Sequence, residues 1–224
     1  EALDLRGHGR SDGDRVFVNT FEEYLDDVDR FLARVRGRHP EQPVFLLGHS
    51  MGGGVTMKVL TITGGRVVPS GSEERTQTTV RAAVLYSTVS ADDLDIINRW
   101  GMGCFGDIAT GEQIIGCNSS DVIPIDLPLN VQNAYRFAAS DANTLKRIAP
   151  IYNLQYVDVP VQIHYGTEDG KFISGTPPEW SVKLTQALRD AGKQAELYQY
   201  DGEGHSFIGQ PWFDFMNRVL RFFD

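Results

Sequence analysis

The chain has 224 residues, which is enough for one domain with a sizeable core and an inserted subdomain but short for two full domains. Hydrophobic residues at 41% and charged residues at 23% are typical of a globular protein, and the net charge of −9 argues against a nucleic-acid partner, because phosphates repel an acidic surface. No stretch approaches the roughly 18 consecutive apolar residues of a membrane span, so we expect no membrane-spanning segment in these residues.

The first 90 residues predict a helix, a strand, a second helix and another strand. Thr20 and Glu23 form a T-x-x-E capping box for the first helix, which Gly37 is expected to end. The apolar run 44–47 predicts a strand that is buried on both faces and closed by Gly48. The remaining predictions are buried helical turns over residues 55–60, a surface loop over 61–79 and a strand over 80–88.

Residues 91–150 differ in composition from the rest, because Gly, Pro and Asn break short apolar pieces, with one helix expected over 131–139. We interpret 91–150 as an inserted cap, and 1–90 with 151–224 as the core domain. The last part predicts a strand over 159–166, a helix with a second capping box at Thr176 and Glu179 that stops at Gly192, a strand over 195–200 and a terminal helix from Pro211. Such alternation is typical of an α/β fold whose mostly parallel sheet has helices on both faces.

The two cysteines, Cys104 and Cys117, leave two interpretations open, a disulfide or two unrelated thiols. They are too few and too sparsely spaced for a zinc site, which needs four clustered Cys or His ligands. We therefore expect no metal and no cofactor.

The segment Gly48-His49-Ser50-Met51-Gly52 fits the pattern G-x-S-x-G between a predicted strand and a predicted helix. On so sharp a turn the serine is in a strained backbone conformation, and the flanking glycines remove Cβ atoms that would collide with the strand and helix. The helix N-terminus favours developing negative charge, and the N–H of Met51 can donate to a substrate oxyanion. Ser50 is therefore a candidate nucleophile; the alternative is a glycine-rich turn whose serine has no chemical role.

A nucleophilic serine needs an imidazole to take its proton and a carboxylate to orient that imidazole. His205 follows the predicted strand 195–200, at the end of the sheet where α/β folds hold their sites. Glu168 and Asp169 both follow the preceding strand, and the chemistry alone does not choose between them. The other histidines have structural interpretations in turns, strands or past a helix: His8, His39, His49 and His164.

These residues resemble the α/β-hydrolase superfamily. The segments "DLRGHGRSDG" and "PVFLLGHSMGG" are similar to the monoacylglycerol lipase and lysophospholipase branch, and "PVQIHYGTEDG" and "GEGHSF" are similar to dienelactone-hydrolase and prolyl-oligopeptidase-type domains. The resemblance implies Ser50 as nucleophile, His205 as base and Asp169, the last residue of G-T-x-D, as the acid. It also implies a cap after the strand 80–88, in agreement with the change in composition at Ala91.

The resemblance further implies parts that these 224 residues lack. In such hydrolases an H-G-x-x-G-like loop, which follows a strand earlier than "DLRGHGRSDG", supplies a second oxyanion N–H. That earlier strand lies in the sheet next to the strand before the serine. We therefore expect the chain to be a fragment of a longer protein, with the second oxyanion donor and the N-terminal strands outside it.

The leading functional hypothesis is a serine hydrolase that cleaves a small-molecule carboxylic ester through an acyl-enzyme on Ser50. A prolyl-oligopeptidase-like serine peptidase is the second hypothesis, and the C-terminal half of the chain alone supports it. The third hypothesis is a non-catalytic scaffold or an inactive fragment, against which the presence of all three candidate triad residues argues. The sequence leaves the oligomeric state open.

Overall fold

In this computed structural model the described residues are 1–14, 18–63, 66–67, 78–90, 92, 95, 149–171 and 175–224. Within them a parallel sheet runs in the order β1-β3-β4-β5, made of β1 (Val44–His49), β3 (Thr78–Tyr86), β4 (Val161–Gly166) and β5 (Ala195–Tyr200). The short strand β2 (Arg66–Val67) pairs antiparallel with the start of β3. The predicted α/β fold with a mostly parallel sheet is confirmed.

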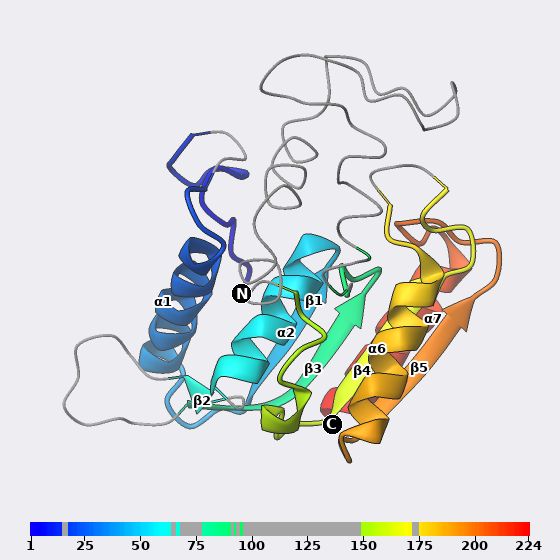
Figure 1. Cartoon of the computed structure of the whole chain (residues 1–224). Coiled ribbons are helices and arrows are strands. Elements are labelled where there is room, and N and C mark those ends of the chain that lie inside the picture. The colour runs from blue at the N-terminus through cyan, green and yellow to red at the C-terminus, as the bar shows by residue number, and fades with distance from the viewer. Residues whose placement is uncertain are drawn as a thin grey trace.

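Helices cover both faces of this sheet (Figure 1). On one face lie α2 (Met51–Thr63) and α6 (Pro178–Asp190), with α1 (Glu22–Arg38) beside α2. On the other face lies α7 (Gln210–Phe223), and the short 3-10 helix η1 (Leu154–Tyr156) precedes β4. Strand and helix therefore alternate along the chain as the sequence predicts.

Strand β3 lies inside the sheet and divides the core into two layers, because successive strand side chains point to opposite faces. Leu85 packs in the cluster that contains Met57 of α2, whereas Val84 packs in the cluster that contains Phe215 of α7. All four side chains are fully buried, and burial of an apolar side chain of this size contributes about 1.5–3 kcal/mol. These two layers fix β3, whose carboxyl end adjoins the candidate site.

Strand β1 is longer and less buried than the sequence predicts. It continues through Gly48 to His49, and the side chain of Leu47 is 47% exposed, so the prediction of burial on both faces is wrong. Among the described strands β1 ends the order and pairs with β3 alone. An apolar run indicates a strand, but the neighbours of that strand decide how much of it is covered.

Helix α1 begins at Glu22, one residue later than a capping box with Thr20 as the N-cap requires, and ends at Arg38 rather than at Gly37. One half of the box is present, because a carboxylate oxygen of Glu23 accepts the N–H of Asn19 at 2.6 Å and that of Thr20 at 3.5 Å. The side chain of Thr20 makes no capping hydrogen bond in the described contacts. The carboxylate therefore closes the turn before α1 without the hydroxyl.

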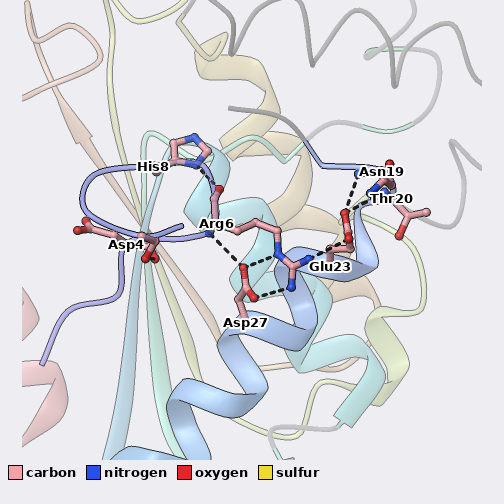
Figure 2. Close-up of polar contacts among 8 residues, drawn as sticks. Asp4, Arg6, His8, Asn19, Thr20, Glu23 and Asp27 are labelled. Atoms are coloured by element: carbon pink, nitrogen blue, oxygen red, sulfur yellow. Dashed lines mark hydrogen bonds and ion pairs between the residues drawn. The ribbon is translucent and has the colours of Figure 1, made fainter. Parts of the chain in front are cut away.

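Arg6 attaches the N-terminal segment to α1 (Figure 2). Its guanidinium donates from Nε and Nη2 to the two carboxylate oxygens of Asp27, at 2.9 Å and 2.7 Å, and from Nη1 to Glu23 at 2.8 Å. The side chain of Asp27 is only 16% exposed, so this two-point ion pair is shielded more than a surface pair. It fixes the segment that begins "DLRGHG" against the helix.

Helix α6 ends as predicted but does not begin as predicted. The N–H of Gly192, which has φ +73°, donates to the carbonyl of Arg189, and the N–H of Lys193 donates to the carbonyl of Leu188, which is the Schellman arrangement. The predicted second capping box is wrong, because the helix has no side-chain cap and the hydroxyl of Thr176 donates instead to a carboxylate in the candidate site.

Other predictions fall outside the described residues. The helix expected over 131–139, both cysteines and nearly all of the predicted cap 91–150 lie there. The predicted loop 61–79 is partly corrected, because α2 continues to Thr63 and residues 66–67 form β2.

Candidate active site

The carboxyl ends of the parallel strands meet at one edge of the sheet, and the candidate residues follow three of them. Ser50 follows β1, Asp169 lies in the turn after β4, and His205 lies in the loop after β5. The strand β3 lies between β1 and β4 in the sheet. The chain therefore places all three residues at the same edge.

Ser50 occupies a strained turn between β1 and α2. Its φ of 55° lies in the left-handed region, which costs a residue other than glycine about 1–3 kcal/mol unless the surroundings hold it. Its N–H donates to the carbonyl of Tyr86 at 2.9 Å, and its carbonyl accepts the N–H of Val89 at 3.0 Å. Both ends of the turn are thus bonded to the end of β3 and the residues after it. Ser50 is partly exposed, and its hydroxyl has no hydrogen-bond partner among the described residues.

The glycines around Ser50 allow two close approaches. A Cβ at Gly48 would lie 2.5 Å from the carbonyl oxygen of Gly52, and a Cβ at Gly53 would lie 2.2 Å from Thr88 Oγ1. A Cβ at Gly52 would meet nothing within 4 Å, so the prediction that Gly52 avoids a collision is wrong. The strand and the helix approach each other at Gly48, and α2 approaches the segment after β3 at Gly53.

The N–H of Met51 is free to donate within the described part of the chain. Met51 is the first residue of α2, and the first N–H groups of a helix have no acceptor inside the helix. The N–H groups of Gly53 and Gly54 bond to the carbonyl of Ser50, whereas no bond is found for that of Met51. The start of α2 is therefore suited to an anionic oxygen.

Asp169 and His205 are directly hydrogen bonded. Nδ1 of His205 lies 3.0 Å from Oδ1 and 3.1 Å from Oδ2 of Asp169, whose side chain is fully buried. Burial opposes ionisation of the carboxyl, but hydrogen bonds from His205 and Thr176 outweigh it and hold the pKa of Asp169 below its ordinary value. Because a carboxylate only accepts, Nδ1 of His205 carries the proton and Nε2 of the neutral ring is a free base.

The geometry distinguishes Asp169 from Glu168, which the sequence chemistry left open. Glu168 pairs with Lys171 at the surface, while its N–H donates to the carbonyl of Glu203 at 2.9 Å. Only Asp169 of the two carboxylates bonds to His205. This is the residue that the family resemblance favours.

The loop that carries His205 is bonded to the ends of β1 and β3. Nε2 of His49 lies 2.9 Å from the carbonyl oxygen of His205, so this nitrogen is the donor, and the His49 ring stacks on Tyr86 with centroids 4.5 Å apart. The hydroxyl oxygen of Tyr86 accepts the N–H of Phe207. Desolvation of its ring holds the pKa of His49 below its ordinary value, although the hydrogen bond to the carbonyl of His205 opposes this shift. Ser50 and His205 are thus connected through the residue that precedes the serine.

The remaining histidines have structural contacts. Nδ1 of His8 donates to the carbonyl oxygen of Arg6, and His39 ends α1 and contacts Glu1. His164 is fully buried in β4, and desolvation, with the charge of Arg218 as a lesser cause, lowers its pKa to about 3. The sequence interpretation of these three residues agrees with their positions.

Sequence reasoning missed three residues that contact the candidate site: Thr176, Tyr86 and His49. Thr176 fits a helix cap in sequence, and the signal against this cap is Pro178, which favours an extended backbone at Pro177 and so delays the start of the helix to Pro178. His49 and Tyr86 act across 156 and 121 residues of sequence, as partners of His205 and Phe207. No local pattern reports contacts at such separations.

Two negative findings concern the described residues only. They contain no group of three or more His, Cys, Asp or Glu side chains that could hold a metal ion. None of their helices combines the length and the apolar character that crossing a membrane requires.

Comparison with protein families matches different models to the two parts of the chain. Residues 1–102 match the serine aminopeptidase S33 model, and residues 133–211 match the dienelactone hydrolase family. Monoglyceride lipase of Mus musculus is 41% identical over 58 residues, which cover 26% of this chain and 19% of that protein. Caffeoylshikimate esterase of Arabidopsis thaliana is 45% identical over 229 residues, which cover 94% of this chain and 63% of that protein. The chain thus spans less than two thirds of these relatives.

Solved structures with low sequence identity share the fold. A monoacylglycerol lipase from Paleococcus ferrophilus is 19% identical with a TM-score of 0.57, over 97% of this chain and 79% of that one. An esterase from Thermogutta terrifontis is 16% identical with a TM-score of 0.60, over 94% and 67%. At such identities the likeness is one of fold.

Proposed function

The chain has the α/β-hydrolase fold and resembles monoglyceride lipase and dienelactone hydrolase, and from this premise we propose that it is a serine hydrolase of carboxylic esters. Ser50 is the nucleophile, His205 the general base and acid, and Asp169 the carboxylate that orients His205. The observation that carries the proposal is the buried Asp169–His205 hydrogen bond at the same sheet edge as a serine with φ 55°. No cofactor takes part.

Acylation starts at the hydroxyl of Ser50. Nε2 of His205 takes its proton while Oγ attacks the ester carbonyl, and the imidazolium that forms keeps its Nδ1–H on Asp169. The tetrahedral intermediate places negative charge on the former carbonyl oxygen, to which the N–H of Met51 donates. His205 then protonates the leaving alcohol, and an acyl-Ser50 ester remains.

Water completes the second half of the reaction. Nε2 of His205 takes a proton from the water, whose oxygen attacks the acyl carbonyl, and a second tetrahedral intermediate forms. Its collapse returns the proton to Oγ of Ser50 and releases the carboxylic acid. Each half uses the same base and the same oxyanion donor.

The relatives suggest which esters to try first. Caffeoylshikimate esterase aligns over 94% of the chain, whereas the monoglyceride lipase matches are local. We therefore favour caffeoyl esters over monoglycerides as substrates. Hydrolysis of p-nitrophenyl esters, caffeoylshikimate and a monoglyceride by the purified protein tests this order, with Ser50→Ala as the matched inactive variant.

A peptidase is the second candidate, because the serine aminopeptidase model matches residues 1–102. Aminoacyl-p-nitroanilides compared with p-nitrophenyl esters separate the two activities. Ester turnover that requires Ser50, with no anilide cleavage, supports the esterase. Anilide cleavage at the higher kcat/KM would overturn it in favour of the peptidase.

A further inference from the structure

Thr176 donates two hydrogen bonds to the buried carboxylate of Asp169. Its hydroxyl donates to Oδ2 at 2.7 Å, and its N–H donates to Oδ1 at 2.9 Å. Gly170 donates a further N–H to Oδ1 at 2.8 Å. Thr176 is only 3% exposed, so no bulk water replaces these donors. The carboxylate is therefore held at both oxygens by one residue.

The chain around Thr176 is built for this contact. Pro177 restricts the backbone of the residue before it to extended conformations, and a β-branched side chain has few rotamers, so the hydroxyl and the N–H are both fixed in direction. A Cβ at the preceding Gly175 would lie 2.7 Å from Oδ1, so only glycine leaves room for the carboxylate there. Thr176 thus donates to Asp169 instead of capping the helix.

The Thr176 hydroxyl and Nδ1 of His205 both donate to the same oxygen of Asp169, Oδ2. Oδ2 lies 2.7 Å from the Thr176 hydroxyl and 3.1 Å from Nδ1 of His205. A hydrogen bond to a carboxylate oxygen lowers its capacity to accept a second one. Without the hydroxyl, His205 would be the sole side-chain donor to Asp169 in the described contacts, and its cation would be held more strongly.

We propose that Thr176 is a positioning residue that sets both the orientation of Asp169 and the strength with which Asp169 holds the His205 cation. The inference rests on the proposed hydrolysis by Ser50, His205 and Asp169. Among the described residues, the other titratable groups around the pair are His49 at the end of β1, Tyr86 at the end of β3, and Glu203 and the Lys171-paired Glu168 in the loops. The variants below leave all of them in place.

The test compares Thr176→Val with Thr176→Ser. Valine keeps the shape, the N–H and the extended backbone but removes the hydroxyl, whereas serine keeps the hydroxyl. Thr185→Val is the control for loss of a buried hydroxyl, because Thr185 is 1% exposed and its hydroxyl donates to the carbonyl of Ser181 in α6, away from Asp169. Two readouts are needed, the pH profile of kcat/KM for a p-nitrophenyl ester and the NMR titration of the His205 ring.

For Thr176→Val we expect the acid limb of the profile and the His205 titration to move up by about half a pH unit, with kcat lower by roughly tenfold. In Thr176→Ser, kcat should return to within about threefold of the wild type and the pH shift should disappear. Thr185→Val should change neither kcat nor the His205 titration. An unshifted titration in folded Thr176→Val, or an equal shift in Thr185→Val, would overturn the inference. If the wild type hydrolyses no ester, the proposed function fails while the NMR titration still decides the role of Thr176.

Discussion

Helix α2 closely approaches the segment after β3 at Gly53, and this contact predicts that Gly53→Ala destabilises the protein. The added Cβ would lie 2.2 Å from Oγ1, 2.6 Å from Cβ and 3.2 Å from Cα of Thr88. Ordinary carbon contacts are about 3.5–4.0 Å, so Thr88 has to move. Thr88 is fully buried, and the next residue, Val89, is bonded to the carbonyl of Ser50, which limits that movement.

The magnitude follows from two opposing effects. Overpacking of this kind costs about 1–3 kcal/mol, and an overlap with three atoms of one residue places Gly53→Ala near the upper end. Alanine in a helix gains about 0.5–1 kcal/mol over glycine. The net loss should be about 2 kcal/mol. Gly52→Ala is the matched control, because it lies in the same helical turn and its Cβ meets nothing within 4 Å, so it should gain about 0.5–1 kcal/mol.

Urea unfolding followed by circular dichroism measures both changes. We expect a lower midpoint for Gly53→Ala and a higher midpoint for Gly52→Ala, with unchanged slopes in both, as for variants that alter the native state alone. Equal stability of the two variants would refute the close packing of α2 on the segment after β3.

Three further changes have defined outcomes. Tyr86→Phe keeps the ring but removes the acceptor of the buried Phe207 N–H, so it should lower the free energy of unfolding by about 1–2 kcal/mol and speed amide exchange at Phe207; unchanged exchange would contradict the contact. The pKa of His164 is about 3 in the folded protein and ordinarily 6.5, so between these pH values only the unfolded chain binds a proton at this residue. The free energy of unfolding should therefore fall by about 2 kcal/mol from pH 7 to pH 5. Urea titrations at the two pH values should show a smaller fall for His164→Gln. Arg6→Lys removes the two-point contact with Asp27 and should cost about 0.5–1 kcal/mol, measured as a lower urea midpoint, and an unchanged midpoint would show that the pair contributes nothing.

The fold was predictable where one local pattern dominates. The strand over 195–200 coincides with β5, and the serine turn lies between a strand and a helix with Ser50 at positive φ. Hydrophobic period and glycine placement encode such features directly. The positions of Ser50, Asp169 and His205 after strands predicted that the three residues lie at one edge of the sheet, where Asp169 and His205 are hydrogen bonded.

The rest depended on contacts between distant segments. Thr176 fits a capping box in sequence, but its hydroxyl bonds to Asp169, because a buried carboxylate needs donors more than an exposed helix start does. The exposure of Leu47 depends on what lies beside β1, which the strand's own residues do not encode. The contact of His49 with His205 joins the ends of β1 and β5, and only the fold brings them together.

Labelling by a fluorophosphonate tests the proposed catalytic serine most directly. We expect one covalent adduct on the folded protein, located by peptide mass spectrometry on Ser50. The adduct should be absent in Ser50→Ala and should form at least about a thousandfold more slowly in His205→Gln, because the hydroxyl then lacks its base. Labelling that persists in Ser50→Ala, or folded wild-type protein that takes up no label, would contradict the proposal that Ser50 is the nucleophile.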